Sequence, residues 1–97
     1  MISLRKQERS SIKLCIISEF TCDFNAYEAM IEGNRDQVMQ FCSEMTLAKV
    51  SDHKCILVAD VTDPAGLHAH MSTPEMRQWD EDNGCVDTVF LMEPVAA

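Results

Sequence analysis

The chain has 97 residues, 46% of them hydrophobic, a length and composition typical of one compact domain with a single small core. Sixteen acidic residues against eight basic ones give a net charge of −8, and half of the basic residues lie within the first 13 positions. Because so acidic a surface repels phosphate backbones and anionic lipid head groups, the composition argues against nucleic-acid and membrane roles for the folded part.

Residues 1–12 (MISLRKQERSSI) are expected to be a flexible basic leader. They contain no apolar run that would form the core of a signal peptide, and no segment approaches the roughly 18 apolar residues of a membrane span. The five cysteines are odd in number and lack a C-x-x-C pair, a pattern typical of reduced thiols in the cytoplasm. We therefore expect a cytoplasmic protein with one domain over residues 13–97.

The domain begins with a predicted strand and a predicted helix. Residues 13–22 (KLCIISEFTC) are rich in strand-forming residues, and both faces of this run are apolar in the middle. Asp23 follows as a plausible helix N-cap, and apolar residues recur at helical spacing over residues 24–45. We expect one helix here with a break or bend at Gly33.

Two further strands and a helical region follow. Residues 45–51 (MTLAKVS) and 55–61 (CILVADV) are predicted strands joined by a polar hairpin connection. Two successive start signals, Asp63-Pro64 and Thr73-Pro74, predict two short helices in tandem. Asn83-Gly84 is the expected stop, and residues 86–92 (VDTVFLM) form the last predicted strand.

The resulting β-α-β-β-α-β order predicts a ferredoxin-like α+β fold, in which a four-stranded antiparallel sheet carries its helices on one face. The other face of such a sheet is uncovered. Three of the predicted strands place apolar residues on both faces, which is not expected for a sheet with one solvated face. We therefore expect a homodimer in which two sheets pack through their open faces.

Two segments carry a resemblance to a known family. Residues 55–63 (CILVADVTD) run directly into a helix, and residues 70–84 (HMSTPEMRQWDEDNG) combine a histidine-containing helix, a second helix start and a glycine before the last strand. Together with the element order, they resemble the dimeric α+β barrel superfamily over about residues 13–93, in particular its antibiotic-biosynthesis-monooxygenase-like members. The resemblance implies a homodimer with a ligand pocket between helices and sheet. Its members range from cofactor-free oxygenases to proteins without known activity, so the fold leaves function open.

Within that resemblance, His68, His70 and Asp60 are the candidates for proton transfer. The two histidines lie about 200° apart around a helix, so at most one of them points into a pocket. Their spacing from the apolar residues does not decide between them, and we favour His68 slightly over His70. Asp60 interrupts an apolar strand and would be a base if it faces the pocket, or a surface residue bonded to Thr62 or Lys49 if it does not.

Four further residues are candidates for contact with a ligand: Tyr27, Trp79, Asn25 and Met71. Trp79 has the size to wall a flat aromatic molecule, although a single tryptophan at helical spacing is also typical of a core. Haem-degrading members of the superfamily use an Asn, a Trp and a His, but here the histidines precede the tryptophan, against the order in that group. We expect no metal and no cofactor, since neither histidine pattern nor the acidic run at residues 80–84 has the spacing of a metal site.

Two functions from different classes fit these features. The first is a monooxygenase-like protein that binds, and as an enzyme would oxidise without a cofactor, a small apolar or aromatic molecule. The second is a non-catalytic dimeric module that binds a ligand or another protein. The two differ in whether histidine and aspartate converge on a closed cavity, which the sequence does not decide.

Overall fold

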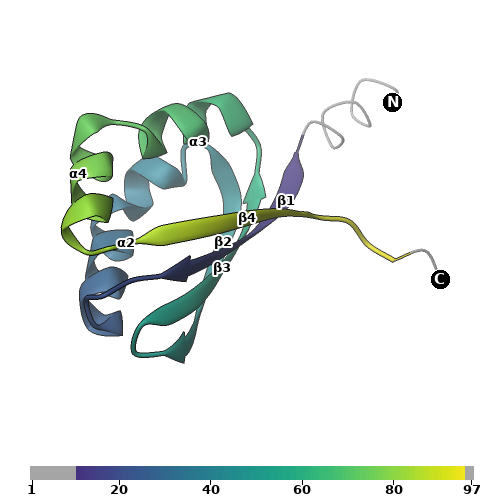
Figure 1. Ribbon diagram of the computed structural model, residues 1–97. Helices are drawn as coiled ribbons and strands as arrows, with labels where there is room; N and C mark the ends of the chain where they lie inside the picture. Colours follow the sequence, from purple (N-terminus) through teal and green to yellow (C-terminus); the bar gives the residue numbers. More distant parts are fainter. Residues whose placement is uncertain (1–10, 96–97) are drawn as a thin grey trace, which may run out of the picture.

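The computed structural model describes residues 11–95, which form four strands and three helices (Figure 1). The elements are, in chain order, β1 (Ile12–Glu19), α2 (Phe24–Val38), β2 (Cys42–Ser51), β3 (Lys54–Val61), α3 (Pro64–Met71), α4 (Pro74–Asp82) and β4 (Val86–Met92). This order confirms the predicted ferredoxin-like α+β class. Most of the expected leader, residues 1–12, lies outside the described residues, and its last residue, Ile12, already belongs to β1.

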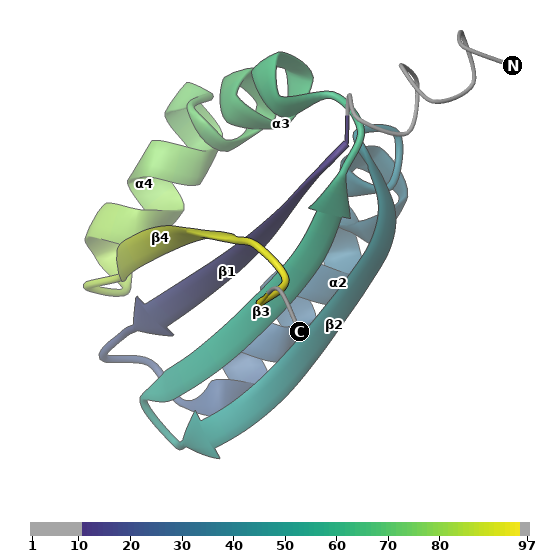
Figure 2. The same ribbon diagram turned by 90° about the vertical axis from the view of Figure 1, so that its right-hand side faces the viewer.

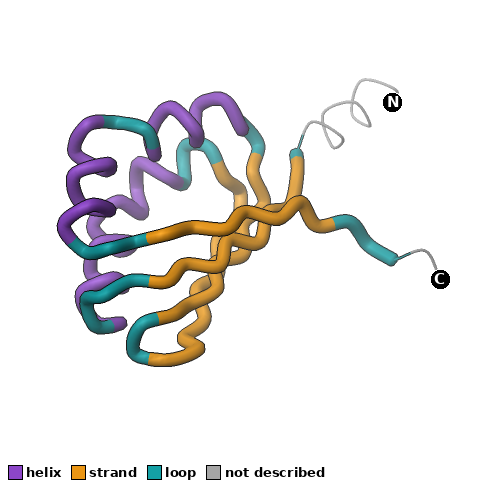
Figure 3. The backbone as a smooth tube through the Cα atoms, viewed as in Figure 1, coloured by secondary structure: helices purple, strands orange, loops and turns teal. Residues whose placement is uncertain are grey.

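The four strands form one antiparallel sheet in the order β2-β3-β1-β4. All three helices lie on one side of it, as the edge-on view of the backbone makes plain (Figure 3). Seen from the open side, α2 lies behind β2 and β3, and α3 and α4 lie on the side of β1 and β4 (Figure 2). Among the described residues, none of the helices is long and apolar enough to cross a bilayer.

Each helix begins at a residue whose side chain caps it, as predicted. Asp23 accepts a hydrogen bond from a backbone N–H of the first turn of α2 at 2.8 Å, and Asp63 does the same for α3 at 3.0 Å. Thr73 caps α4, and proline follows both Asp63 and Thr73 at the start of the helix. These local signals place the tandem helices correctly without any help from tertiary contacts.

The prediction for the first helix was wrong in two respects. Helix α2 passes through Gly33 without interruption and ends at Val38. Strand β2 begins at Cys42, three residues before the expected strand. A glycine in a helix interior costs only about 1 kcal/mol, which packing of the buried face outweighs. The helical spacing of Cys42 and Met45 arises from a β-bulge between Cys42 and Glu44, which brings residues three apart onto the same face of the sheet.

The core between helices and sheet consists of two clusters of buried residues. The first cluster consists of Phe20, Phe24, Tyr27 and Cys55. The second consists of Cys42, Ala59, Val61 and Leu67. Strand β3 supplies residues to both, because its alternate side chains are buried along its whole length. The inner face of the sheet is therefore the floor of everything that lies under the helices.

No helix of residues 11–95 lies on the opposite face of the sheet. Five apolar residues point to this face: Cys15, Ile17, Ile56, Val58 and Phe90. Cys15 lies opposite both Val58 and Phe90, and Ile17 lies opposite Ile56. Residues directly opposite each other in paired strands point to the same side of a sheet. Phe90 is 49% exposed. The sheet thus presents an apolar surface on its open side, as the sequence pattern predicted.

Candidate functional site

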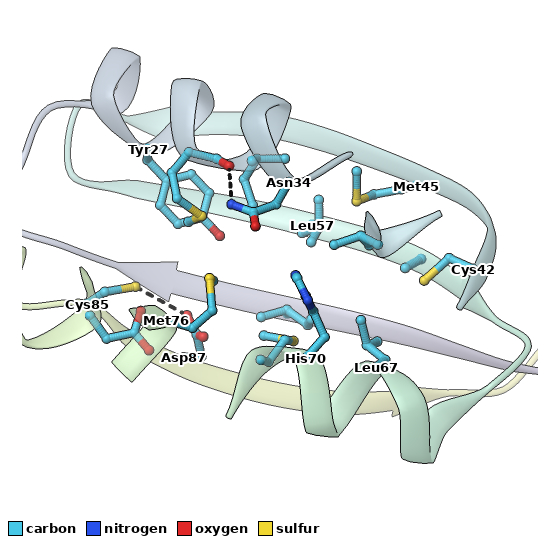
Figure 4. Close-up of a pocket in the computed structure, with 17 residues that line it drawn as sticks. Tyr27, Asn34, Cys42, Met45, Leu57, Leu67, His70, Met76, Cys85 and Asp87 are labelled. Carbon is cyan, nitrogen blue, oxygen red and sulfur yellow. Dashed lines mark hydrogen bonds between the residues drawn. The ribbon is translucent and has the colours of Figure 1, made fainter. Parts of the chain in front are cut away.

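A small, partly open cavity lies between the two groups of helices, over the inner face of the sheet. It measures about 60 Å³, and its walls come from α2 on one side and from α3 and α4 on the other (Figure 4). The floor is formed by strand residues that include Ile16, Leu57 and Ala59. Apolar side chains dominate the lining, and four of them are methionines: Met30, Met45, Met71 and Met76. Methionine is flexible, so such a wall can change shape around a bound molecule.

A second, more open cleft of about 380 Å³ adjoins the cavity between α2 and the two short helices. The cavity and the cleft share four lining residues, Met30, Asn34, His70 and Met76. Asn34 is held by a 2.9 Å hydrogen bond from its side-chain amide to the carbonyl of Met30, one turn earlier in α2. These four side chains therefore lie at the boundary between the cavity and the outer cleft.

His70 is the histidine that reaches this boundary. Its Nε2 atom is buried and has no hydrogen-bond partner among the described residues, and its ring lies 6.2 Å from that of Phe41. His68 is exposed and lines neither space, so our preference for His68 was mistaken. The reason is helical geometry: Leu67 faces the core, and a residue three positions later shares its face, whereas the next residue is turned by about 100°.

A chain of hydrogen bonds lies at the end of the cavity where Tyr27 and Asp87 stand. Ser18, which is fully buried, donates from Oγ to a carboxylate oxygen of Asp87 at 2.6 Å and lies 3.1 Å from the hydroxyl of Tyr27. Tyr27 stacks on Phe20 with ring centroids 4.6 Å apart. Burial, the largest effect, raises the pKa of the Tyr27 hydroxyl well above its ordinary value, so this group stays protonated.

Two carboxylates and a thiol stand at the same end. Asp80 and Asp87 both line the cavity, and Cys85 donates from Sγ to Asp87 at 3.5 Å. Burial raises the pKa of Asp80, and the charge of Asp87 adds to this effect. Burial followed by both carboxylates raises the pKa of Cys85 far above its usual range. The Cys85 thiol is therefore not an activated nucleophile.

The other predicted candidates lie apart from one another. Asp60 points to the open face of the sheet, where the ammonium of Lys13 lies 3.4 Å from its carboxylate; the partner is neither Thr62 nor Lys49. This follows from the alternation of β3, whose neighbouring residues Ala59 and Val61 are buried on the inner face. A base at Asp60 is therefore on the wrong side of the sheet for this cavity.

The ligand-contact candidates divide in the same way. Tyr27 and Met71 line the cavity. Trp79 lines the outer cleft and meets the Tyr27 ring edge-on at 6.0 Å, while Asn25 is exposed and lines neither space. The structure thus brings His70, Tyr27 and Met71 to one cavity and leaves out His68 and Asn25.

Sequence reasoning missed Ser18, Asp80 and Asp87. Ser18 and Asp87 are polar residues at inward positions of apolar strands, and they lie directly opposite each other in the pairing of β1 with β4. The pairing of β1 with β4 was the signal that could have identified Ser18 and Asp87. For metals, no group of three or more histidine, cysteine or acidic residues suited to an ion occurs in the described part of the chain.

Comparison with known proteins identifies the fold. No protein-family model matches the chain, and no curated protein matches it. Among solved structures it is similar to SnoaB, a cofactor-independent oxygenase from Streptomyces nogalater, with a TM-score of 0.66 at 10% sequence identity. The match covers 90% of this chain and 95% of SnoaB. The likeness confirms the ferredoxin-like fold.

Proposed function

We propose that this protein binds a small apolar or aromatic molecule between its helices and sheet and oxidises it without a cofactor. The observation that carries the proposal is the Nε2 atom of His70, buried at an apolar cavity without a hydrogen-bond partner. An unsatisfied buried polar atom costs roughly 1–3 kcal/mol, so a ligand that bonds to this nitrogen would remove a substantial cost. A ligand with a hydroxyl group would satisfy this nitrogen.

The dimensions of the site support a ligand of one or two rings. The cavity of about 60 Å³ is smaller than ordinary ligand sites, which span roughly 300–1,000 Å³. The adjoining cleft adds about 380 Å³, and four side chains line both spaces. Rotation of Met30 and Met76, which have three flexible bonds each, would join the two spaces into one site of ordinary size.

The oxygenase part of the proposal is supported by the fold shared with SnoaB, whose description is that of a cofactor-independent oxygenase. Without a cofactor, the electrons that reduce O₂ must come from the substrate, which favours an electron-rich phenol. His70 would accept the phenolic proton, because the phenolate is the more easily oxidised form. For 1-naphthol the balanced reaction is 1-naphthol + O₂ → 1,4-naphthoquinone + H₂O, in which C4 gains one oxygen atom and the other leaves as water.

The test uses 1-naphthol as ligand and substrate, with calorimetry for binding and an oxygen electrode for turnover. We expect the wild-type protein to bind 1-naphthol and to consume one O₂ per quinone formed. His70→Phe keeps an aromatic ring but lacks the nitrogen, so binding should weaken about five- to tenfold and turnover should fall about 10²-fold or more. The same substitution should raise the free energy of unfolding of the free protein by about 1 kcal/mol, because it removes the unpaired atom.

His68→Phe is the matched control, since His68 lies two residues away on the same helix and is exposed. It should leave both binding and turnover unchanged. Failure of the wild-type protein to bind 1-naphthol at millimolar concentration, or equal binding by His70→Phe, would overturn the proposed site. Binding without oxygen uptake would leave the ligand-binding function and remove the enzymatic one.

The quaternary part of the proposal is a homodimer through the open face of the sheet. The apolar residues of that face, Cys15, Ile17, Ile56, Val58 and Phe90, favour burial against a second copy of the same surface. A domain of this size also gains stability from association, because its own core is small.

A further inference from the structure

We infer that the ligand carries a hydrogen-bond donor, such as a hydroxyl or amino group, at the end of the cavity where Tyr27 and Asp87 lie, and that the site excludes anions there. The inference rests on the proposed function, since it names the class of molecule that the same cavity takes. The inference depends on which groups at that end of the cavity can still accept or donate a hydrogen bond.

The direction of the hydrogen-bond chain decides the first point. Ser18 has one hydroxyl hydrogen, and it goes to Asp87 at 2.6 Å. The Tyr27 hydroxyl, 3.1 Å from the same Ser18 oxygen, must therefore be the donor in that contact. With its only hydrogen committed to Ser18, Tyr27 presents only its oxygen lone pairs, which accept.

The charges at this end point the same way. Within residues 11–95, Asp80 and Asp87 are the charged residues that line the cavity, and no lysine or arginine of this part of the chain lines it. Cys85, between them, gives its hydrogen to Asp87. A ligand carboxylate placed here would stand beside two carboxylates without a lysine or arginine to offset its charge, and such a contact between like charges is unfavourable.

Two polar regions of the cavity define the shape of the ligand. Figure 4 shows Tyr27, Cys85 and Asp87 toward one end of the cavity and His70 nearer its middle, with Leu67 and Cys42 farther along. A flat molecule with one hydroxyl at His70 would extend its far end toward Tyr27 and Asp87. The inferred ligand is therefore an aromatic molecule with polar groups at opposite ends, the second of them a donor.

Three naphthalenes with the same hydroxyl test this, with binding measured by calorimetry without oxygen: 1-naphthol, 1,5-dihydroxynaphthalene and 5-hydroxy-1-naphthoate. Relative to 1-naphthol, we expect the second hydroxyl to tighten binding about five- to tenfold and the carboxylate to weaken it at least about tenfold. Asp87→Asn and Tyr27→Phe should each reduce the gain from the second hydroxyl, and Asp87→Asn should also reduce the penalty for the carboxylate. Asp36→Asn, on the exposed side of α2, should change neither ratio.

Failure of this inference is distinct from failure of the proposed function. If none of the three molecules binds, the cavity is not a site for such ligands and both fail. If 1-naphthol binds but the dihydroxy compound binds no better, or the carboxylate binds as well, the function stands and the inferred polarity is wrong. If Asp87→Asn does not fold, Tyr27→Phe, which keeps the stacked ring, decides the result.

Discussion

At the residue scale, a few buried hydrogen bonds stabilise the apolar interior of this protein. Ser18 is fully buried on the inner face of β1, and it satisfies the hydroxyl of Tyr27 while its own hydrogen reaches Asp87. Inside an apolar region such bonds matter mostly through what their loss leaves behind, because a buried group without a partner is costly. Ser18 therefore both stabilises the core and determines which way Tyr27 points its hydrogen.

Replacement of Ser18 by Ala should lower the free energy of unfolding by about 1–3 kcal/mol, because the buried Tyr27 hydroxyl loses its acceptor. Urea unfolding followed by circular dichroism measures this. In the double variant Ser18→Ala/Tyr27→Phe both polar groups are gone, so its loss should be smaller than the sum of the two single losses. Strictly additive losses would show that the two side chains do not depend on each other.

At the scale of elements, two helical glycines have opposite surroundings. Gly33 lies in the exposed interior of α2, and a Cβ there would meet no atom within 4 Å. A Cβ on Gly66 in α3 would lie 2.5 Å from the Asp63 carboxylate and 2.6 Å from the ring of Phe41, which contacts His70. Of these two glycines, only Gly66 is needed for close packing. Gly33 was the position at which the sequence predicted a break or bend of the helix.

The same substitution at the two positions should therefore have opposite effects. Gly33→Ala should raise the free energy of unfolding by roughly 0.5–1 kcal/mol through better helix propensity. Gly66→Ala should lower it by about 1 kcal/mol, since the strain of crowding Phe41 and Asp63 exceeds that gain. Thermal unfolding of both variants side by side gives the comparison. A stabilised Gly66→Ala protein would mean that Phe41 moves aside at little cost.

At the scale of the whole molecule, the main feature is the apolar open face of the sheet. The three helices cover one face of the sheet. Phe90 lies on the other face, and 49% of the surface of Phe90 is exposed. Its neighbour Val89 lies opposite Ile16 and so points to the helix side, where it is 54% exposed. The two adjacent residues are similarly exposed but face opposite ways.

This contrast gives a matched test of the proposed homodimer. Light scattering at micromolar concentration should give twice the mass of the chain for the wild-type protein. Phe90→Glu should shift it to the monomer, because a carboxylate would be buried in the interface without a partner. Val89→Glu, on the same strand but on the helix side, should remain dimeric. A wild-type monomer, or equal dissociation by both variants, would exclude an interface on the open face.

The sequence alone determined the element order, the three helix caps and the fold class, because these depend on residues close together in the chain. Asp23, Asp63 and Thr73 each cap a helix through a backbone N–H three residues away, so the signal is local and readable. The mistaken end of the first helix has the opposite cause. A bulge at the start of β2 imitated helical spacing, and only its pairing with β3 reveals it.

For the site, the sequence supplied candidates and the tertiary structure sorted them. Residue types identified His68, His70, Asp60 and Tyr27, but only the packing of α3 against the sheet turns His70 inward, and only the alternation of β3 turns Asp60 outward. The contact of Ser18 with Asp87 spans 69 positions of the chain and exists only through the pairing of β1 with β4. Helix caps and element order depend on neighbouring residues, whereas the lining of a cavity comes from residues far apart in the chain. This is why the fold could be predicted and the residues that line the cavity could not.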